Sequence, residues 1–203
     1  MELNTYIEII GTVLSIIFLV LLINRNRYCW PFGIISSLLS IYLFISVKLY
    51  SEASLYSLYV VFGFYGWWNW TKNLESTVSD ELGISQIKAK PLILYSLVGI
   101  LFAAAIGYFW ANYSDADFPY IDATTTSFAL LATWLEARRI FQTWYFWMVL
   151  NSTSIALYFV KGLPIYAVLM LIFTAMSIWG WWSWRKELQK MAEREGFEPS
   201  EPG

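Results

Sequence analysis

Residues 144–158, WYFWMVLNSTSIALY, form an apolar segment that carries one line of polar and aromatic side chains. At intervals of three and four residues, that line consists of Trp144, Trp147, Asn151, Ser154 and Tyr158. This spacing predicts a helix with all five on one face, because residues three and four apart are neighbours on a helix surface. The other positions are mostly large apolar residues. We expect lipid to contact them, and the polar line to face the interior of a helical bundle.

The composition of the whole chain indicates an integral membrane protein of the all-α class. Of its 203 residues, 58% are hydrophobic and only 14% are charged, and the mean hydropathy is +0.52. A soluble domain needs far more solvated side chains to cover its surface. We expect a single membrane transport domain over residues 1–186. The polar tail, residues 187–203, is expected to be cytoplasmic and partly disordered.

Seven apolar segments are long enough to be transmembrane helices. They cover approximately residues 5–23, 29–48, 54–71, 92–110, 122–139, 143–160 and 164–184. Eleven of the 13 Lys and Arg residues lie in alternate connections between these segments or after the last one. The positive-inside rule therefore predicts an external N-terminus and a cytoplasmic C-terminus. Asp115, Asp117 and Asp122 are expected in an external loop.

The sequence contains an internal repeat. Moving it by 114 positions places Trp30 on Trp144 and lays GWWNWTK at 66–72 over GWWSWRK at 180–186. This predicts a 3+1+3 organisation, with repeat 1 at about 5–72, a linker helix at about 92–110 and repeat 2 at about 122–186. Because one helix joins the two triplets, both run in the same direction, which makes a parallel repeat. A binding site is expected near the bilayer midplane, where the triplets meet.

Several motifs follow one another in a recognisable order. They are YGWWNW at 65–70, FPYID at 118–122, the helix end at Ala137, Arg138 and Arg139, and W-x-x-W-x-x-x-N at Trp144, Trp147 and Asn151. Together with the 3+1+3 layout, they resemble the PnuC family of bacterial vitamin transporters over about residues 5 to 186.

The resemblance implies facilitated diffusion of nicotinamide riboside across the bacterial inner membrane, with uptake drawn inward by phosphorylation in the cytoplasm. It also implies a fold similar to that of the SWEET sugar transporters, with an extra linking helix, and a homotrimer. Relatives implied to carry thiamine, riboflavin or nucleosides leave the substrate open. For carriers of nicotinamide riboside, the resemblance implies an amide near Tyr56 and an amide or acidic residue near Leu169, where this chain has Tyr and Leu.

The residues expected to bind substrate are polar or aromatic and lie within the predicted spans. They are Trp147, Asn151, Trp144, Ser154, Tyr158, Ser37, Tyr56, Tyr59 and Glu136. Such an aromatic set suits a pyridinium or thiazolium cation, since a cation over an aromatic ring gains about 0.5–2 kcal/mol. Glu136 is a candidate cation site, because acids within membrane spans are rare and usually functional.

Each of these residues also has a purely structural interpretation. Asn151 could bond to another helix, Trp147 could pack between helices, and Trp144 could anchor at the membrane interface. Glu136 could pair with Arg139 at the end of its helix. The Ser residues could bond to their own backbone, and the Tyr residues could pack. The Trp clusters at 67–70 and 181–184 indicate an interfacial belt, and Gly66 and Gly180 indicate close helix approach.

Other function classes lack the residues they need. The chain has no His and a single Cys, Cys29, and it has neither a phosphate-binding loop nor a nucleophile–base pair. We expect no catalytic residue, metal, cofactor or nucleic-acid partner. Without a row of membrane acids, passive transport is favoured over ion coupling. A SWEET-like sugar carrier is the more distant alternative, and a membrane enzyme or sensor would need groups that are absent.

Overall fold

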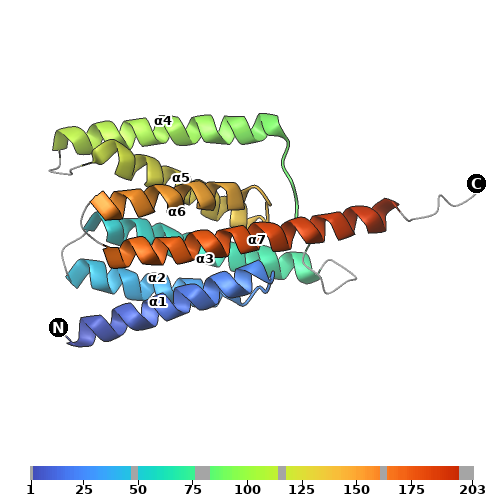
Figure 1. The fold of residues 1–203 in the computed structure, drawn as a ribbon, viewed down its shortest axis with the longest axis horizontal. Coiled ribbons are helices and arrows are strands. Elements are labelled where there is room, and N and C mark those ends of the chain that lie inside the picture. Colours follow the sequence, from blue (N-terminus) through green and yellow to red (C-terminus); the bar gives the residue numbers. More distant parts are fainter. Residues whose placement is uncertain (1, 47–49, 76–82, 114–117, 161–163, 197–203) are drawn as a thin grey trace, which may run out of the picture.

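A computed structural model of the chain describes residues 2–46, 50–75, 83–113, 118–160 and 164–196. Within them the chain is all-helical, as predicted. Its seven helices are α1 (Glu2–Ile23), α2 (Cys29–Ser46), α3 (Tyr50–Glu75), α4 (Ala89–Tyr113), α5 (Pro119–Ala137), α6 (Thr143–Val160) and α7 (Pro164–Gly196). Helix α7 continues well beyond the predicted end at 184 and projects from the bundle (Figure 1).

Two helices end in the same kind of turn. After α1, Arg25 has a positive φ of 57°, and after α5, Arg139 also has a φ of 57°. In the first turn the amide of Asn26 donates to the carbonyl of Leu21 at 2.9 Å, and in the second the amide of Ile140 donates to Leu135 at 2.9 Å. These left-handed residues stop the helices by the Schellman arrangement, which satisfies the last carbonyl groups. Helix α5 therefore ends at Ala137 rather than at the predicted 139.

The helices pack as a closed ring with one helix outside it. Around the ring, contacts join α1 to α2, α2 to α3, α3 to α5, α5 to α6, α6 to α7 and α7 back to α1. Helix α4 packs on α5 and, within the described residues, on no other helix; it lies at one edge of the molecule (Figure 1). The triplets α1–α3 and α5–α7 thus meet at two seams, α3/α5 and α1/α7.

By length and composition, α1, α2, α4 and α7 can each cross a membrane. Helices α3, α5 and α6, which the sequence also predicted as spans, do not reach that level of apolarity in the described residues. Helix α6 carries Asn151 and several Trp, Ser and Thr residues, and α5 carries Glu136 and a run of Thr. These more polar helices belong to the same ring as α1, α2 and α7, and they supply much of the polar interior described below.

Two pairs of tryptophans hold the interior of the triplets together. The rings of Trp30 and Trp70 meet edge to face, with centroids 5.7 Å apart, and those of Trp144 and Trp184 do so at 5.3 Å. Trp30 packs directly on the backbone of Gly66, and Trp144 on that of Gly180. The close approach expected at both glycines is therefore present. Trp70 and Trp184 are fully buried, so the interfacial belt predicted for these clusters is wrong for these two rings.

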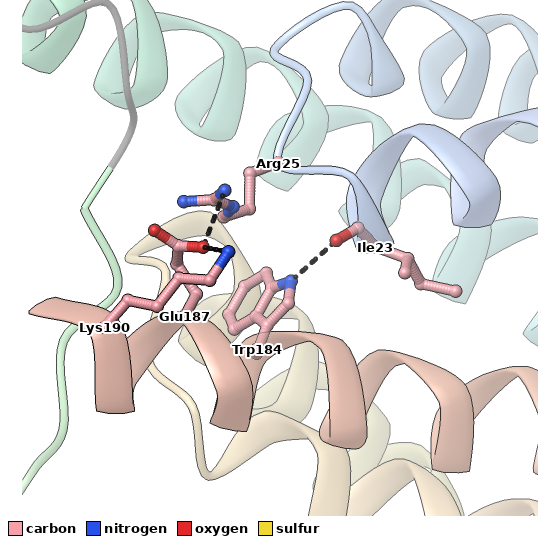
Figure 2. Close-up of polar contacts among 5 residues, drawn as sticks. All are labelled: Ile23, Arg25, Trp184, Glu187 and Lys190. Atoms are coloured by element: carbon pink, nitrogen blue, oxygen red, sulfur yellow. Dashed lines mark hydrogen bonds and ion pairs between the residues drawn. The ribbon is translucent and has the colours of Figure 1, made fainter.

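The same tryptophans also close the two seams. The indole N–H of Trp70 donates to the carbonyl of Glu136 at 3.3 Å, across α3/α5. The indole N–H of Trp184 donates to the carbonyl of Ile23 at 3.1 Å, across α1/α7 (Figure 2). Each bond supplies a donor to a carbonyl near a buried helix end, where water is excluded.

Replacing Gly66 or Gly180 by Ala is expected to destabilise the protein, because the new methyl group would overlap the indole of Trp30 or Trp144. Overpacking of this kind costs about 1–3 kcal/mol, and the melting temperature in detergent should fall in both variants. Gly11→Ala is the control, since a methyl there would meet only Leu39 at an ordinary 4.0 Å. Equal melting temperatures for the three variants would contradict this packing argument.

Candidate functional site

A cavity with two adjoining lobes lies between the two triplets. The first lobe has a volume of about 170 Å³ and the second about 150 Å³. Ser15 and Phe18 of α1, Glu136 of α5 and Trp147 of α6 line both lobes, so the lobes meet at these residues. Together their volumes fall at the lower end of the range of about 300–1,000 Å³ that is typical of small-molecule sites.

The first lobe is rich in hydroxyl groups. They belong to Ser15, Ser36, Ser37, Tyr56, Tyr59 and Thr133. Ser15 and Ser36 lie 2.7 Å apart through their Oγ atoms, and both also contact the carbonyl of Gly11, at 3.0 and 2.9 Å. Thr133 donates to the carbonyl of Ala129 at 2.8 Å. These hydroxyls are held in place by the backbone, yet each oxygen can still accept a hydrogen bond from a ligand.

Aromatic rings form the walls of the first lobe. Tyr56 and Tyr59 of α3 pack edge to face, with centroids 5.4 Å apart. Trp147 faces the lobe from α6, and its buried indole N–H lies beside the carboxyl group of Glu136. A buried donor needs an acceptor, and this carboxyl group or a polar group of a ligand in the cavity can supply it.

The second lobe contains an amide and a hydroxyl that face each other from α6 and α7. Asn151 Nδ2 donates to Ser177 Oγ at 3.3 Å, and both residues are buried. Asn151 therefore forms the bond between helices that the structural interpretation expected, and it also lines the cavity. Because this bond engages one N–H, the second N–H and the carbonyl oxygen of the amide remain suited to a ligand.

Of the residues expected to bind substrate, Ser37, Tyr56, Tyr59, Glu136, Trp147 and Asn151 line the cavity. Trp144, Ser154 and Tyr158 line neither lobe. Trp144 is fully buried against Gly180 and Trp184, so it is not an interfacial anchor either. The predicted polar line on α6 is continuous, but the cavity touches only its middle.

Sequence reasoning missed the contribution of α1. Ser15 and Phe18 line both lobes, although they lie in the most apolar helix. Ser36, Thr133 and Ser177 were also missed. The internal repeat could have identified Ser177, because the residues that line the two lobes correspond under the offset of 114.

That correspondence is regular. Gly33, Ser37, Tyr59 and Gly63 line the first lobe, and the residues 114 positions later, Trp147, Asn151, Phe173 and Ser177, line the second lobe. The paired residues occupy equivalent positions in the two triplets, but their side chains differ in size. Where the first triplet has Gly33, the second has the indole of Trp147, and the ring of Phe18 packs on Gly33.

The helix-end ion pair considered for Glu136 is not formed. Glu136 is buried and has no ion pair in the described part of the chain, and Nε of Arg139 is buried without a partner. Burial lowers the pKa of the Arg139 guanidinium from its usual value. No three His, Cys, Asp or Glu side chains among the described residues are grouped to hold a metal ion.

The sequence of the chain places it among known transporters. Residues 5–186 match the sequence model of the family described as nicotinamide mononucleotide transporter. The chain belongs to this family, the PnuC family. Its members among the relatives below are membrane transporters rather than enzymes.

Three relatives illustrate the range of this PnuC family. The riboflavin/roseoflavin transporter RibM of Streptomyces davaonensis is 23% identical over 186 residues, which cover 86% of this chain and 84% of that protein. The nicotinamide riboside transporter PnuC of Neisseria mucosa is 24% identical over 92% of this chain and 74% of that protein. The crystal structure of the vitamin B3 transporter PnuC has the same fold, with a TM-score of 0.75, 22% identity, and coverage of 92% of this chain and 83% of that chain.

Proposed function

We propose that this protein is a facilitated-diffusion carrier (a uniporter) for a B-vitamin or nucleoside-type precursor, with nicotinamide riboside as the preferred substrate. The observation that carries the proposal is the two-lobed cavity between the triplets, lined by aromatic rings, hydroxyls and one amide. A flat ring joined to a sugar needs such a lining, since the rings contact its faces and the hydroxyls bind its oxygens. Thiamine is the alternative within the family, and a sugar is the more distant one.

For the fold we propose a 3+1+3 parallel repeat, similar to that of SWEET transporters. Support comes from contacts that recur at the offset of 114. They are the left-handed turns at Arg25 and Arg139, the Trp–Gly contacts, the Trp–Trp pairs and the indole donors of the two seam bonds, whose acceptors, Glu136 and Ile23, are one position out of register. The seams themselves follow the pattern, because α3 packs on α5 as α7 packs on α1. The unit would be one transport domain over residues 1–186.

For the site we propose that the substrate ring lies against Trp147, with Tyr56 and Tyr59 on the opposite wall. Asn151 and Ser37 would donate and accept hydrogen bonds with the polar groups of the substrate. Trp144, Ser154 and Tyr158 are left out of this proposal because they line neither lobe.

For alternating access we propose that the α1/α7 seam opens and the α3/α5 seam acts as the hinge. At the end of the bundle where α1 and α5 terminate, α1 and α7 are joined by Trp184, and by Arg25, whose guanidinium lies 3.3 Å from the Glu187 carboxylate (Figure 2). Lys190 lies 4.0 Å from the same carboxylate. The Arg25–Glu187 ion pair is partly exposed and can separate at low cost, and opening the seam also breaks the buried bond from Trp184 to the carbonyl of Ile23.

The α3/α5 seam is reinforced by contacts to backbone atoms. Besides the Trp70 bond, Asn69 Nδ2 donates to the carbonyl of Ala137 at 2.7 Å. The turn after α5 is also tied to the segment before α4, where the amide of Ser85 donates to Arg139 at 3.0 Å and the amide of Phe141 donates to Ser85 at 2.9 Å. This seam is therefore better suited to stay closed while the other opens.

We further propose a homotrimer in the bacterial inner membrane, with the N-terminus outside and the C-terminus in the cytoplasm. The charge distribution supports this orientation, because Arg25, Arg139 and Glu187 lie at one end of the bundle together with most basic residues. Asp115, Asp117, Lys48 and Lys161, which enter the same argument, lie outside the described residues. In this orientation the α1/α7 contacts form a cytoplasmic gate.

Equilibrium binding to purified protein, followed by Trp fluorescence, tests the proposed substrate. Nicotinamide riboside should bind more tightly than thiamine, riboflavin or glucose. Uptake into proteoliposomes should then proceed without an imposed proton or sodium gradient. Tightest binding of riboflavin or glucose would reject the proposed substrate, and uptake that requires an ion gradient would reject passive transport.

Asn151→Ala should weaken nicotinamide riboside binding several-fold, because the cavity loses an amide that can donate and accept hydrogen bonds. Ser154→Ala is the matched control, since Ser154 lies one turn further along α6 and lines neither lobe. Binding is measured by titration, and the melting temperatures of the two variants are compared to show that both are folded. If the two variants bind equally, Asn151 does not contact the substrate.

Cross-linking tests which seam moves. In a Cys29→Ser background, Arg25→Cys with Glu187→Cys should allow a short bis-maleimide to lock α1 to α7 and stop uptake into proteoliposomes. Asn69→Cys with Arg138→Cys bridges α3 to the end of α5, and the same reagent should leave most uptake intact. Arrest by the second cross-link and not by the first would reverse the assignment of gate and hinge.

A further inference from the structure

Among the described residues that line the two lobes, Glu136 is the one carboxylic acid, and none is a Lys or an Arg. It is 2% exposed and lies in the last turn of α5, where both lobes meet. No basic side chain in the described residues lies within ion-pair distance of it. The titratable groups that face it from α2 and α3, the thiol of Cys29 and the phenol of Tyr59, provide no positive charge.

The local fold does not require this carboxyl group, as the other triplet shows. Leu22 occupies the equivalent place before the turn that follows α1, and it is also fully buried. The turn forms equally well in both cases, because the amide of Arg25 donates to the carbonyl of Leu22 at 2.9 Å and that of Arg139 to the carbonyl of Glu136 at 2.8 Å. Only backbone atoms of Glu136 take part in the turn and in the seam bond from Trp70.

A buried carboxyl group without a counter-ion is unfavourable for folding. A ligand that carries a positive charge would supply the missing counter-ion and favour the ionised carboxylate. The rings of Phe18, Tyr59 and Trp147, which line the cavity with it, would add cation–π attraction. The carboxyl group and these rings favour a cation, and the described lining has no basic side chain that would favour an anion.

We propose that Glu136 is the specificity-determining residue of this site, and that it selects substrates whose ring carries a positive charge. This inference rests on the proposed function of the cavity as the transport site, and it adds the charge of the substrate class. Pyridinium and thiazolium compounds would be accepted. Neutral rings of similar size, including the isoalloxazine of riboflavin, and anionic phosphorylated forms would be rejected.

The test uses two ligands that differ in ring charge but share one skeleton, nicotinamide riboside and its neutral dihydro form. Calorimetric titration of the full chain should show that the cation binds about tenfold or more tightly than the neutral form. Glu136→Gln keeps the size and polarity of the side chain and removes the charge. It should weaken the cation about tenfold and change the neutral ligand by less than about threefold.

Two further variants serve as a control and as an alternative in this test. Asp122→Asn makes the same chemical change at the other end of α5, outside both lobes, and should leave both affinities unchanged. If Glu136→Gln does not fold, Glu136→Leu introduces the residue type already tolerated at Leu22, and it should show the same loss of charge preference. Unchanged preference in a folded variant at position 136 would overturn the proposal, as would equal weakening of both ligands.

The outcomes separate this inference from the proposed substrate. Tight binding of nicotinamide riboside that is insensitive to Glu136→Gln rejects the role of Glu136 alone. Tighter binding of thiamine, lost in Glu136→Gln, rejects the preferred substrate and supports the charge selection. Tightest binding of a neutral ligand by the unmodified protein rejects both.

Discussion

The arrangement depends on how the buried ends of α1 and α5 satisfy their last carbonyl groups. A helix that ends inside a membrane bundle leaves carbonyls that water cannot reach, and each one without a donor is costly. Here a left-handed arginine turns the chain back on itself, and an indole N–H from the third helix of the opposite triplet donates to a carbonyl in the last turn, that of Glu136 or Ile23. The turns therefore end the helices, and the two indole bonds join the triplets at the same places.

This constraint also positions the cavity. Because Trp70 must reach the carbonyl of Glu136, the last turn of α5 is drawn against α3, and the side chain of Glu136 enters the space between the triplets. Each indole reaches its carbonyl only because a second tryptophan packs on a glycine beside it, Trp30 on Gly66 and Trp144 on Gly180. The four tryptophans are thus structural residues, and the aromatic rings open to a substrate are Trp147 and the tyrosines of α3.

The helices were predictable because hydrophobic length and periodicity depend on local sequence alone. The ring-lined interior and most of its residues were also predictable, since polar groups such as Asn151 and Glu136 have few favourable places within a membrane. The cavity boundary was not, because Trp144 and Trp147 share a face of α6 and only tertiary packing on Gly180 removes the first from the cavity. Likewise, Trp68 and Trp70 look alike in sequence, but one is exposed and the other is a buried donor.

The unequal side chains at corresponding positions bear on the kind of solute this site can hold. Two identical triplets would form a cavity with two-fold symmetry, suited to a solute whose two ends are alike. Here the first triplet has Gly33, Ser37 and Gly63 where the second has Trp147, Asn151 and Ser177, so the second triplet contributes a ring and an amide to the lining where the first contributes a glycine and a hydroxyl. Glu136 adds a charge on one side where Leu22 has none. A solute with a flat ring at one end and a hydroxylated group at the other matches that asymmetry, because each end meets a lining of its own chemistry.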